Sequence, residues 1–529
     1  MLPLILFEDE HLLVVNKPPG WNTHAPSPFA GEGIYDWLKH REPRWASLAT
    51  IHRLDKETSG VLVFGKTPLA NRSLTEQFSG RAVRKRYALL TDCPPRRHEF
   101  LVKSGISRSG ERYVSTAHGE PAETRFEVQN LKFEIRHAGE ESVIHCCELV
   151  AEPLTGRTHQ IRVHAAANGF PILGDRLYGG RSFQRMCLHA HSLAFEHPTS
   201  SERVHFECQP EFARHWREVL NCSIFDRAET NAFRIAHGAT DLTPGFYLDA
   251  LGDYVLAQFD RPLDQAATTP DGYVGSYFKL LTHSVQSAKP AESCPRHVHG
   301  QTAPDRFVIR ENGVKFELSF KEGYSTGLFL DQRDNRRRLL TGHVAADFSL
   351  GTQDSRLEVL NCFAYTCGFS VCAALAGART TSLDLSKKYL EWGRRNFALN
   401  DLDPARHDFI YGDAFDWLKR LTKKGRAFDV AILDPPTFSQ SKEAGVFRAE
   451  KDYGRLVTAA LAVLRPGGIL FASSNAAEWK PEDFLGKIEG AIRAARRKIA
   501  QRHYVPQPPD FPVSRTEPAY LKTVWLRIT

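Results

Sequence analysis

The stretch His52-Arg53-Leu54-Asp55-Lys56-Glu57-Thr58-Ser59-Gly60 runs directly into the apolar segment Val61-Leu62-Val63-Phe64. It sets one carboxylate between two basic residues and a polar turn, immediately before a strand that can be buried in a sheet. Opposite charges nearby would hold Asp55 ionised even where water is scarce. An ordinary turn with an ion pair has the same composition, so other stretches must decide between a site and a turn.

Two further stretches carry polar residues in patterns that point to a cleft. Lys85-Arg86-Tyr87-Ala88-Leu89-Leu90 places an aromatic ring on a strand among basic residues. The third stretch runs from Leu154 to His164, and from Gln160 onward its residues alternate between polar and apolar. This alternation predicts a strand whose polar face, including Arg162, lies toward a cleft.

Together these stretches resemble the RluA family of pseudouridine synthases, whose signature reads His-Arg-Leu-Asp, two variable residues and Thr-Ser-Gly. The resemblance covers roughly the first 200 residues and implies an α+β synthase domain over residues 1–222. It also implies catalytic roles for Asp55, for Tyr87 as the ring that stacks on the target base, and for Arg162 as the cation that pairs with Asp55. Arg53, inside the motif, joins this predicted site.

Isomerising uridine means breaking the bond between sugar and base nitrogen, turning the base and rejoining it through carbon. No redox step, metal or cofactor is required, so none is expected for this domain. A carboxylate must act as nucleophile or as base at the sugar, and the sequence leaves open which of the two Asp55 does. The target uridine must leave its stack, so base flipping and an RNA-binding surface are expected.

In the second half, apolar strands end repeatedly in acidic residues. The run Val359-Leu360-Asn361-Cys362-Phe363-Ala364-Tyr365-Thr366-Cys367-Gly368 is a strand entering a tight loop, where a doubly wound fold binds its cofactor. Asp384 ends the next strand and could accept both ribose hydroxyls of a nucleoside, and Asp413 is placed to bond an adenine amine. Phe428 to Leu433 forms a buried strand that ends in Asp434-Pro435-Pro436.

These features resemble a class I methyltransferase that uses S-adenosylmethionine. The run from Gly327 to Arg337 and the Asp-Pro-Pro-Thr-Phe-Ser segment narrow the resemblance to the RlmI and RlmK group of ribosomal RNA methyltransferases. The resemblance implies a Rossmann-like α/β domain over residues 331–529 and a small central α+β domain of RNA-binding type over residues 223–330. The cofactor-binding residues that it implies are Gln332, Arg333, Asn361, Phe363, Tyr365, Gly368, Asp384, Asp413, Asp434, Pro435 and Pro436.

Two details of this half bear on cofactor and target. The usual glycine-rich loop is thinned to Cys367 beside a single glycine, and a left-handed Cys367 would cost about 1 kcal/mol. Forming 5-methylcytosine needs a thiolate after Asp-Pro-Pro or on the next strand, where this chain has Thr437 and Ser473-Ser474-Asn475. A ring nitrogen of guanine is therefore the favoured target, and Cys362 and Cys367 are candidates only if a thiol proves essential.

Length and composition set the remaining bounds. A chain of 529 residues with 42% hydrophobic and 25% charged residues predicts a soluble protein of two or three domains. The net charge of +7 fits a polyanionic partner without establishing one. Ten scattered cysteines, no signal peptide and no membrane-spanning stretch predict a protein of the reducing cytoplasm that has no membrane partner. The oligomeric state cannot be predicted.

The sequence thus predicts a multidomain, bifunctional RNA-modifying enzyme, a pseudouridine synthase joined to a methyltransferase, with 23S ribosomal RNA as the favoured partner. One alternative is a synthase acting on transfer RNA with a second domain that forms 5-methylcytosine. Another is an RNA-binding ribosome assembly factor in which one active site has decayed. The loop at Cys367, which has only one glycine, is the best support for a lost active site. The presence of Asp55, Asp384 and Asp434 argues against that loss.

Overall fold

The computed structural model describes residues 2–136, 143–261, 269–281, 294–323, 325–351, 356–441 and 445–529. The described chain forms two compact units. Unit 1 comprises residues 1–24, 33–36 and 47–226, and unit 2 comprises residues 25–32, 37–46 and 227–529. Unit 2 therefore includes two short pieces from the N-terminal region of the sequence, which the sequence did not predict.

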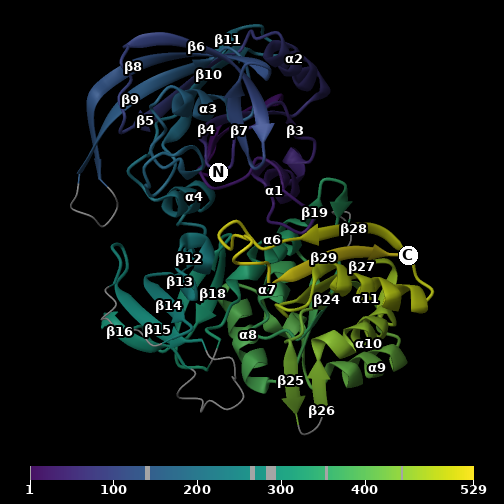
Figure 1. Cartoon of the computed structure of the whole chain (residues 1–529). Helices are drawn as coiled ribbons and strands as arrows, with labels where there is room; N and C mark the ends of the chain where they lie inside the picture. The colour runs from purple at the N-terminus through teal and green to yellow at the C-terminus, as the bar shows by residue number, and fades with distance from the viewer. Residues whose placement is uncertain are drawn as a thin grey trace. The chain divides into compact units, whose positions relative to one another are not determined.

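Unit 1 is built on a mixed eleven-stranded sheet with the order β1-β2-β4-β10-β5-β9-β8-β6-β7, in which β3 pairs with β4 and β11 with β10 (Figure 1). Its strands are β1 (Ile5–Glu8), β2 (Leu12–Lys17), β3 (Ala49–Thr50), β4 (Ser59–Gly65), β5 (Arg84–Thr91), β6 (Glu99–Ser109), β7 (Arg112–Thr116), β8 (Glu120–Arg136), β9 (Val143–Pro153), β10 (Leu188–Glu196) and β11 (Arg203–Glu207). Its helices are α1 (Ile34–Arg41), whose last residues belong to unit 2, α2 (Pro68–Ser79), α3 (Gln160–Ala167) and α4 (Trp216–Ile224).

The buried strand β4 positions the first motif. Every residue of β4 is buried between β2, which runs antiparallel to it, and β10, which runs parallel. Gly60 has a φ of +119°, and a Cβ there would overlap the backbone of Ala190 on β10. The apolar run after the motif thus fixes the strand, and the glycine lets β10 approach closely.

Unit 2 contains a five-stranded sheet with the order β12-β13-β14-β15-β16 and a seven-stranded sheet with the order β23-β22-β21-β24-β27-β29-β28. The smaller sheet consists of β12 (Ala232–His237), β13 (Phe246–Leu251), β14 (Tyr254–Phe259), β15 (Gly275–Leu280) and β16 (Arg296–Gly300). Separate two-stranded sheets are formed by β17 (Phe307–Glu311) with β18 (Val314–Leu318), β19 (His343–Ala345) with β20 (Phe348–Ser349), and β25 (Phe438–Ser441) with β26 (Gly445–Arg448). The larger sheet consists of β21 (Glu358–Cys362), β22 (Arg379–Asp384), β23 (Asp408–Tyr411), β24 (Phe428–Leu433), β27 (Leu464–Ser474), β28 (Ile499–Val505) and β29 (Lys522–Ile528).

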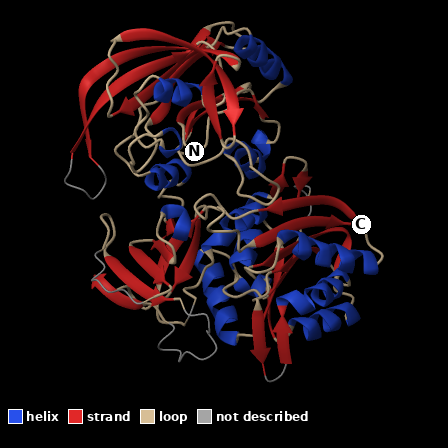
Figure 2. Cartoon of the chain, in the orientation of Figure 1, coloured by secondary structure: helices blue, strands red, loops and turns tan. Residues whose placement is uncertain are grey.

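Helices cover both faces of the seven-stranded sheet (Figure 2). They are α6 (Arg333–Thr341), α7 (Gly368–Leu375), α8 (Lys387–Leu399), α9 (Ala414–Lys423), α10 (Ala449–Leu461) and α11 (Pro481–Ala494). Along β24, Val430 and Ile432 pack into the cluster that holds α7 and α8, whereas Ala431 and Leu433 pack into the cluster that holds α9, α10 and α11. The predicted Rossmann-like fold is confirmed: β21, β22, β23, β24 and β27 run parallel, and both faces of β24 are buried, whereas β29 runs antiparallel to β27 and β28.

The arginine run from Arg333 to Arg338 is not a solvated helix face. Arg336 forms two hydrogen bonds, of 2.6 and 2.7 Å, with Glu311, and Arg333 forms two, of 2.7 and 3.0 Å, with Asp510. Both arginines are almost fully buried. They hold α6 inside unit 2, which is a structural role for most of this run.

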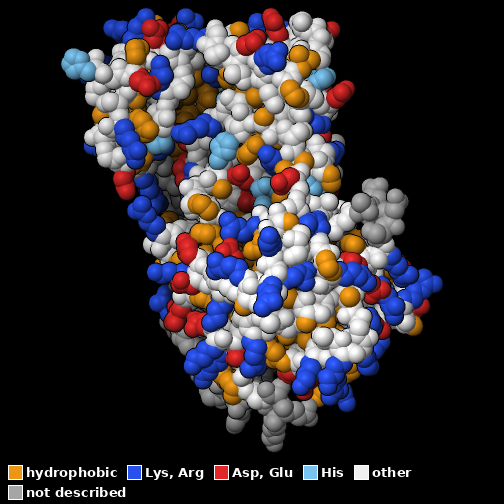
Figure 3. Space-filling view, turned by 90° about the vertical axis from the view of Figure 1, so that its right-hand side faces the viewer, with side chains coloured by type: hydrophobic (Ala, Val, Ile, Leu, Met, Phe, Trp, Pro, Cys, Tyr) orange, Lys and Arg blue, Asp and Glu red, His pale blue; other side chains and the backbone are white. Residues whose placement is uncertain are grey.

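No helix among the described residues is long and apolar enough to cross a membrane. Lys and Arg side chains are distributed over the face shown in Figure 3, interspersed with Asp and Glu, so the net positive charge is not gathered in one place on that face. The predicted borders at residues 222 and 330 stay predictions.

Candidate active sites

The predicted synthase residues line one cavity of unit 1. Its volume is about 930 Å³, and Arg53, Asp55, Tyr87 and Arg162 all contribute to its wall. The structure therefore brings together side chains from the first motif, from β5 and from α3, as the sequence predicted. The cavity is large enough for a nucleotide, because ligand pockets typically have 300–1,000 Å³.

A buried lysine from β2 holds the turn that carries Asp55. The Nζ of Lys17 donates to the carbonyl oxygens of Pro18, Lys56 and Thr58 at 2.9, 3.1 and 2.8 Å. Burial lowers the pKa of Lys17 to about 7, although the charges of Glu57 and Asp55 act in the opposite direction. Sequence reasoning missed this residue, since a lysine at a strand end usually points into solvent.

Two side chains at the start of α3 face Asp55. Nη1 of Arg162 and Nε2 of His159 lie 3.6 and 3.7 Å from Oδ2 of Asp55. The side chains of Arg53 and Lys56, which the sequence offered as neighbouring opposite charges, are exposed, and their effect on Asp55 stays a prediction. The charge partner Arg162 was predicted from the family resemblance and lies where it can act.

Arg162 is itself fixed by an acid that sequence reasoning did not assign. Its Nε and Nη2 donate to the two carboxylate oxygens of Asp175 at 2.7 and 2.8 Å, and both side chains are almost fully buried. This bidentate geometry leaves Nη1 directed toward Asp55. The signal was present in the sequence as Gly174-Asp175, shortly after the basic block, but spacing alone does not show which acid meets which arginine.

The block from Gln160 onward is a helix, not the predicted strand. It forms α3, and its polar side chains point to separate partners. Gln160 accepts from the Thr155 hydroxyl at 2.7 Å, and His164 contacts Thr124 at 2.9 Å. The alternation gave the wrong prediction because a segment of eight residues is too short to distinguish the period of a strand from that of a helix that buries several polar residues.

Tyr87 lies on β5 between β9 and β10, and its ring lines the cavity. Burial and the negative charge of Asp55 raise the pKa of Tyr87 well above its ordinary value. The hydroxyl therefore stays protonated at neutral pH and can donate a hydrogen bond to a base, while the ring offers a stacking surface.

His52, the first motif residue, has a structural role. Its Nε2 accepts from the backbone N–H of Val63 at 3.2 Å, and its ring stacks on Phe78 at 4.6 Å. Burial lowers the pKa of His52 to about 3, so it is a neutral acceptor that ties the motif to β4.

In unit 2 the predicted cofactor residues follow neighbouring parallel strands. β21 lies between β22 and β24, so the strand order reverses at β21 and β24, which is where open α/β sheets bind ligands. Asn361 and Phe363 lie at the end of β21, Asp384 ends β22, and Asp434 follows β24. The acids and the loop thus meet at one edge of the sheet.

The loop after β21 is held in an unusual backbone conformation. Phe363, Tyr365 and Cys367 have positive φ values of 60°, 49° and 63°. The Sγ of the left-handed Cys367 occupies the space left by the missing side chain of Gly393 on α8. Three strained residues in one loop indicate a functional site, since such strain persists where the surroundings impose it.

Asp384 orders this loop from the neighbouring strand. Its Oδ2 accepts from the backbone N–H of Tyr365 and its Oδ1 from that of Ser386, both at 2.8 Å. Burial raises the pKa of Asp384, and these two hydrogen bonds act against it. Each carboxylate oxygen keeps a second lone pair, so Asp384 can still accept from two ribose hydroxyls.

Asn361 carries a buried acceptor without a hydrogen-bond partner among the described residues. Its Nδ2 donates to the Ser370 hydroxyl at 2.9 Å, while its Oδ1 is buried and unpaired. Gly368 begins α7 directly behind it. An unpaired buried acceptor beside a strained loop fits a bound polar group, because such atoms are costly to leave unmatched.

Asp434 lies beside Gln332, whose Nε2 is 3.3 and 3.4 Å from its two oxygens and donates to Ser473 at 2.8 Å. Burial raises the pKa of Asp434 to about 6. A carboxylate poised near neutral pH at a strand end is typical of a functional site, and Pro435 and Pro436 fix the chain that follows it.

Two predicted cofactor residues have other partners. Oδ1 of Asp413 accepts from the backbone N–H groups of Phe415 and Asp416 at 2.9 and 3.1 Å, so Asp413 caps α9. Arg333 is buried against Asp510, as described above. Structural roles explain both residues, and their predicted contact with cofactor stays a prediction.

The thiols near this edge do not suit nucleophilic chemistry. Cys362 and Cys367 are fully buried, and burial raises the pKa of each to about 12. A thiolate is the reactive form of cysteine, so neither is a good candidate for attack on a cytosine ring.

Comparison with known proteins supports both predicted enzyme domains. The model of the family described as S-adenosylmethionine-dependent methyltransferase matches residues 253–527, and that of the RNA pseudouridylate synthases matches residues 11–167. A ribosomal RNA large subunit methyltransferase of Deinococcus radiodurans is 35% identical over 321 residues, which cover 57% of this chain and 73% of that protein.

Two further relatives are similar to parts of the chain. Ribosomal RNA large subunit methyltransferase K/L of Psychrobacter sp. is 42% identical over 182 residues, which cover 34% of this chain and 21% of that protein. The crystal structure of the methyltransferase SMU.776 complexed with SAH is 30% identical, with a TM-score of 0.48, and the match covers 57% of this chain and 76% of that one.

Proposed function

The chain belongs to the S-adenosylmethionine-dependent methyltransferases and carries an N-terminal RNA pseudouridylate synthase domain, and we propose that both enzymes modify large-subunit ribosomal RNA. For the synthase, the observation that carries the proposal is the cavity in which Asp55 faces Arg162 while Tyr87 forms part of the same wall. For the methyltransferase, it is the family itself, with relatives named for large-subunit ribosomal RNA.

In the synthase cavity, each of the three side chains has a distinct task. Arg162, clamped by Asp175, supports a charged Asp55, which acts on the sugar of the flipped uridine as nucleophile or base. Tyr87 stacks on the freed base while it turns, and its protonated hydroxyl can donate to a ring atom. This domain needs no cofactor for the isomerisation, because no atom is gained or lost.

In the methyltransferase half, S-adenosylmethionine supplies the methyl group. We propose that Asp384 binds the ribose, that the loop from Phe363 to Cys367 shapes the nucleoside side of the site, and that Asn361 accepts a hydrogen bond at its unpaired Oδ1. We further propose that the target base enters beside Asp434 and the two prolines that follow it.

We propose a ring nitrogen of guanine as the methyl acceptor. Thr437 and Asn475 occupy the positions where a cytosine methyltransferase offers a thiol, and the Thr437 hydroxyl bonds the Asn475 amide oxygen at 2.7 Å. The buried thiols of Cys362 and Cys367 do not replace that nucleophile.

Nucleoside mass spectrometry of ribosomal and transfer RNA from a deletion strain tests this function. The strain is complemented with wild type, Asp55→Asn or Asp434→Asn. We expect the first variant to lose one pseudouridine and the second one methylguanosine, both in large-subunit RNA. Loss from transfer RNA, or a missing 5-methylcytidine, would contradict the proposed substrate, and unchanged nucleosides would favour an assembly factor.

A further inference from the structure

Part of the N-terminal region is built into unit 2. Within this unit, Nε1 of Trp37 donates to Oδ2 of Asp334 on α6 at 3.0 Å. The ring of Phe29 meets Tyr504 on β28 edge-on, with 5.0 Å between the centroids. These contacts hold the short pieces 25–32 and 37–46 against the edge strand of the seven-stranded sheet.

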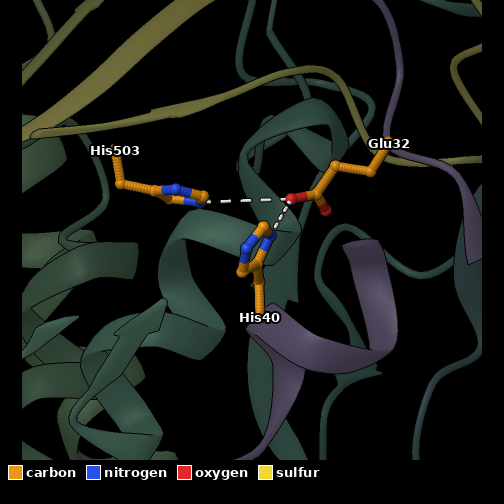
Figure 4. Close-up of side chains that lie close together, drawn as sticks. All are labelled: Glu32, His40 and His503. Atoms are coloured by element: carbon orange, nitrogen blue, oxygen red, sulfur yellow. Dashed lines mark hydrogen bonds and ion pairs between the residues drawn. The ribbon is translucent and has the colours of Figure 1, made fainter. Parts of the chain in front are cut away.

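This arrangement gathers three metal-binding side chains from distant parts of the sequence: Glu32, His40 and His503 (Figure 4). Nδ1 of His40 lies 2.6 Å from Oε1 of Glu32, and Nε2 of His503 lies 4.0 Å from the same oxygen. All three potential ligand atoms lie within 4.8 Å of one another. The side chains are only 10%, 19% and 14% exposed, respectively, so the cluster is not a loose surface group.

One atom of the cluster lacks a partner. Nε2 of His503 is buried and has no hydrogen-bond partner among the described residues, although it points toward the Glu32 carboxylate. The separation of 4.0 Å is too long for a direct hydrogen bond.

The distances suit a small tetrahedral ion. Zinc binds histidine nitrogen and carboxylate oxygen at about 2.0–2.1 Å, which places its ligand atoms about 3.3 Å apart. The separations of 2.6 and 4.0 Å from Oε1 of Glu32 lie on either side of that value, so small side-chain rotations would complete the geometry. Two imidazoles and one carboxylate are also a donor set that zinc favours, with water as the fourth ligand.

We propose that Glu32, His40 and His503 bind a divalent transition-metal ion of the zinc type. The ion links the N-terminal pieces of unit 2 to β28 and thereby stabilises this unit. It lies outside both proposed active sites, and no catalytic step depends on it.

One neighbouring charge sets a limit on the affinity. Nη2 of Arg338 lies 3.8 Å from the same Glu32 oxygen, while its Nε and Nη1 donate to Val344 and Asp334. Arg338 is thus fixed in place and competes with the ion for the carboxylate. We therefore expect weaker binding than in structural zinc sites built from cysteine thiolates.

Titration of the metal-free full-length protein with Co²⁺ tests the site. We expect one equivalent of cobalt to give visible ligand-field absorption without the charge-transfer band of a thiolate ligand. His503→Gln and Glu32→Gln should each weaken this binding more than about 100-fold, because loss of even an outer partner of a ligand costs 10–100-fold. His343→Gln is the matched control, since His343 contacts the Lys39 carbonyl at 3.3 Å and lies outside the cluster.

A stability measurement keeps the test decisive. The unfolding transition of unit 2 is the one whose midpoint S-adenosylmethionine raises. Zinc should raise the same midpoint in wild type and in His343→Gln, but not in Glu32→Gln or His503→Gln. Retained heat of S-adenosylmethionine binding shows that these variants are folded. A thiolate band, absence of the cobalt signal, or a signal unchanged in both ligand variants would overturn the proposal.

Discussion

Replacing Asp434 by asparagine should stabilise the methyltransferase unit while it abolishes methyl transfer. Burial raises the pKa of this carboxyl from an ordinary 3.8 to about 6. The folded protein therefore binds this proton more tightly than the unfolded chain. The stabilisation that comes from the protonated group is fully present below about pH 4 and is lost as the pH rises through about 6.

The size of the effect follows from this shift. About two pKa units correspond to about 3 kcal/mol of unfolding free energy at pH 7.5, and to about half of that at pH 5. An asparagine has nearly the same shape and carries no charge, so it removes this cost. Its amide oxygen can still accept from Gln332, whose Nε2 lies 3.3 Å from Oδ1 of Asp434.

Scanning calorimetry of wild type and Asp434→Asn between pH 5 and pH 7.5 measures the effect. We expect the variant to unfold at a higher temperature at pH 7.5, with a smaller gain at pH 5, in the transition that S-adenosylmethionine raises in wild type. Equal or lower stability at both pH values would refute the reasoning that burial keeps this carboxylate under strain. Methylation assays on the same samples show whether the gain in stability costs activity.

Three other changes test single contacts. Asp175→Asn should lower kcat for pseudouridine formation about 100-fold with little change in KM, because Arg162 loses its bidentate hydrogen bonds to Asp175. Steady-state kinetics with an RNA fragment measure both constants, and a change in KM alone would contradict this. Cys362→Ala should keep methyl transfer within a fewfold of wild type in a radiolabelled methyl assay, whereas complete loss in a folded variant would revive 5-methylcytosine chemistry. Gly60→Ala should lower the calorimetric midpoint of the synthase unit by several degrees, since a side chain there is strained and meets β10; an unchanged midpoint would argue against that close approach.

Sequence patterns predicted the larger architecture because strong signals support it. The strand-end acids and the Asp-Pro-Pro turn lie at the edge of a parallel sheet, and the N-cap of α8 is Ser386, whose side chain accepts from Tyr389. Long apolar strands flanked by turn residues leave few alternative folds.

The acids that pair with the buried arginines escaped the sequence for one physical reason. Arg162, Arg333 and Arg336 each look like surface or ligand-binding cations in sequence, and each is buried against an acid that lies elsewhere in the chain. Pairing partners such as Asp175 and Asp510 are decided by tertiary packing, and no local periodicity reports them. A buried bidentate pair can look like a solvated charge until its partner is located.

Unit 2 is not continuous in sequence, and this limits how the two enzymes can be separated. A fragment that begins at residue 223 contains the whole seven-stranded sheet but lacks residues 25–46. It would leave Asp334 without the indole of Trp37, and Arg338 without the Glu32 carboxylate, both in buried positions. Loss of these polar contacts and of the packing around them costs free energy, so the fragment should unfold at a lower temperature than unit 2 in the full chain. Fusing residues 25–46 back onto the fragment should restore the midpoint, and a fragment as stable as the full chain would show that these contacts contribute little.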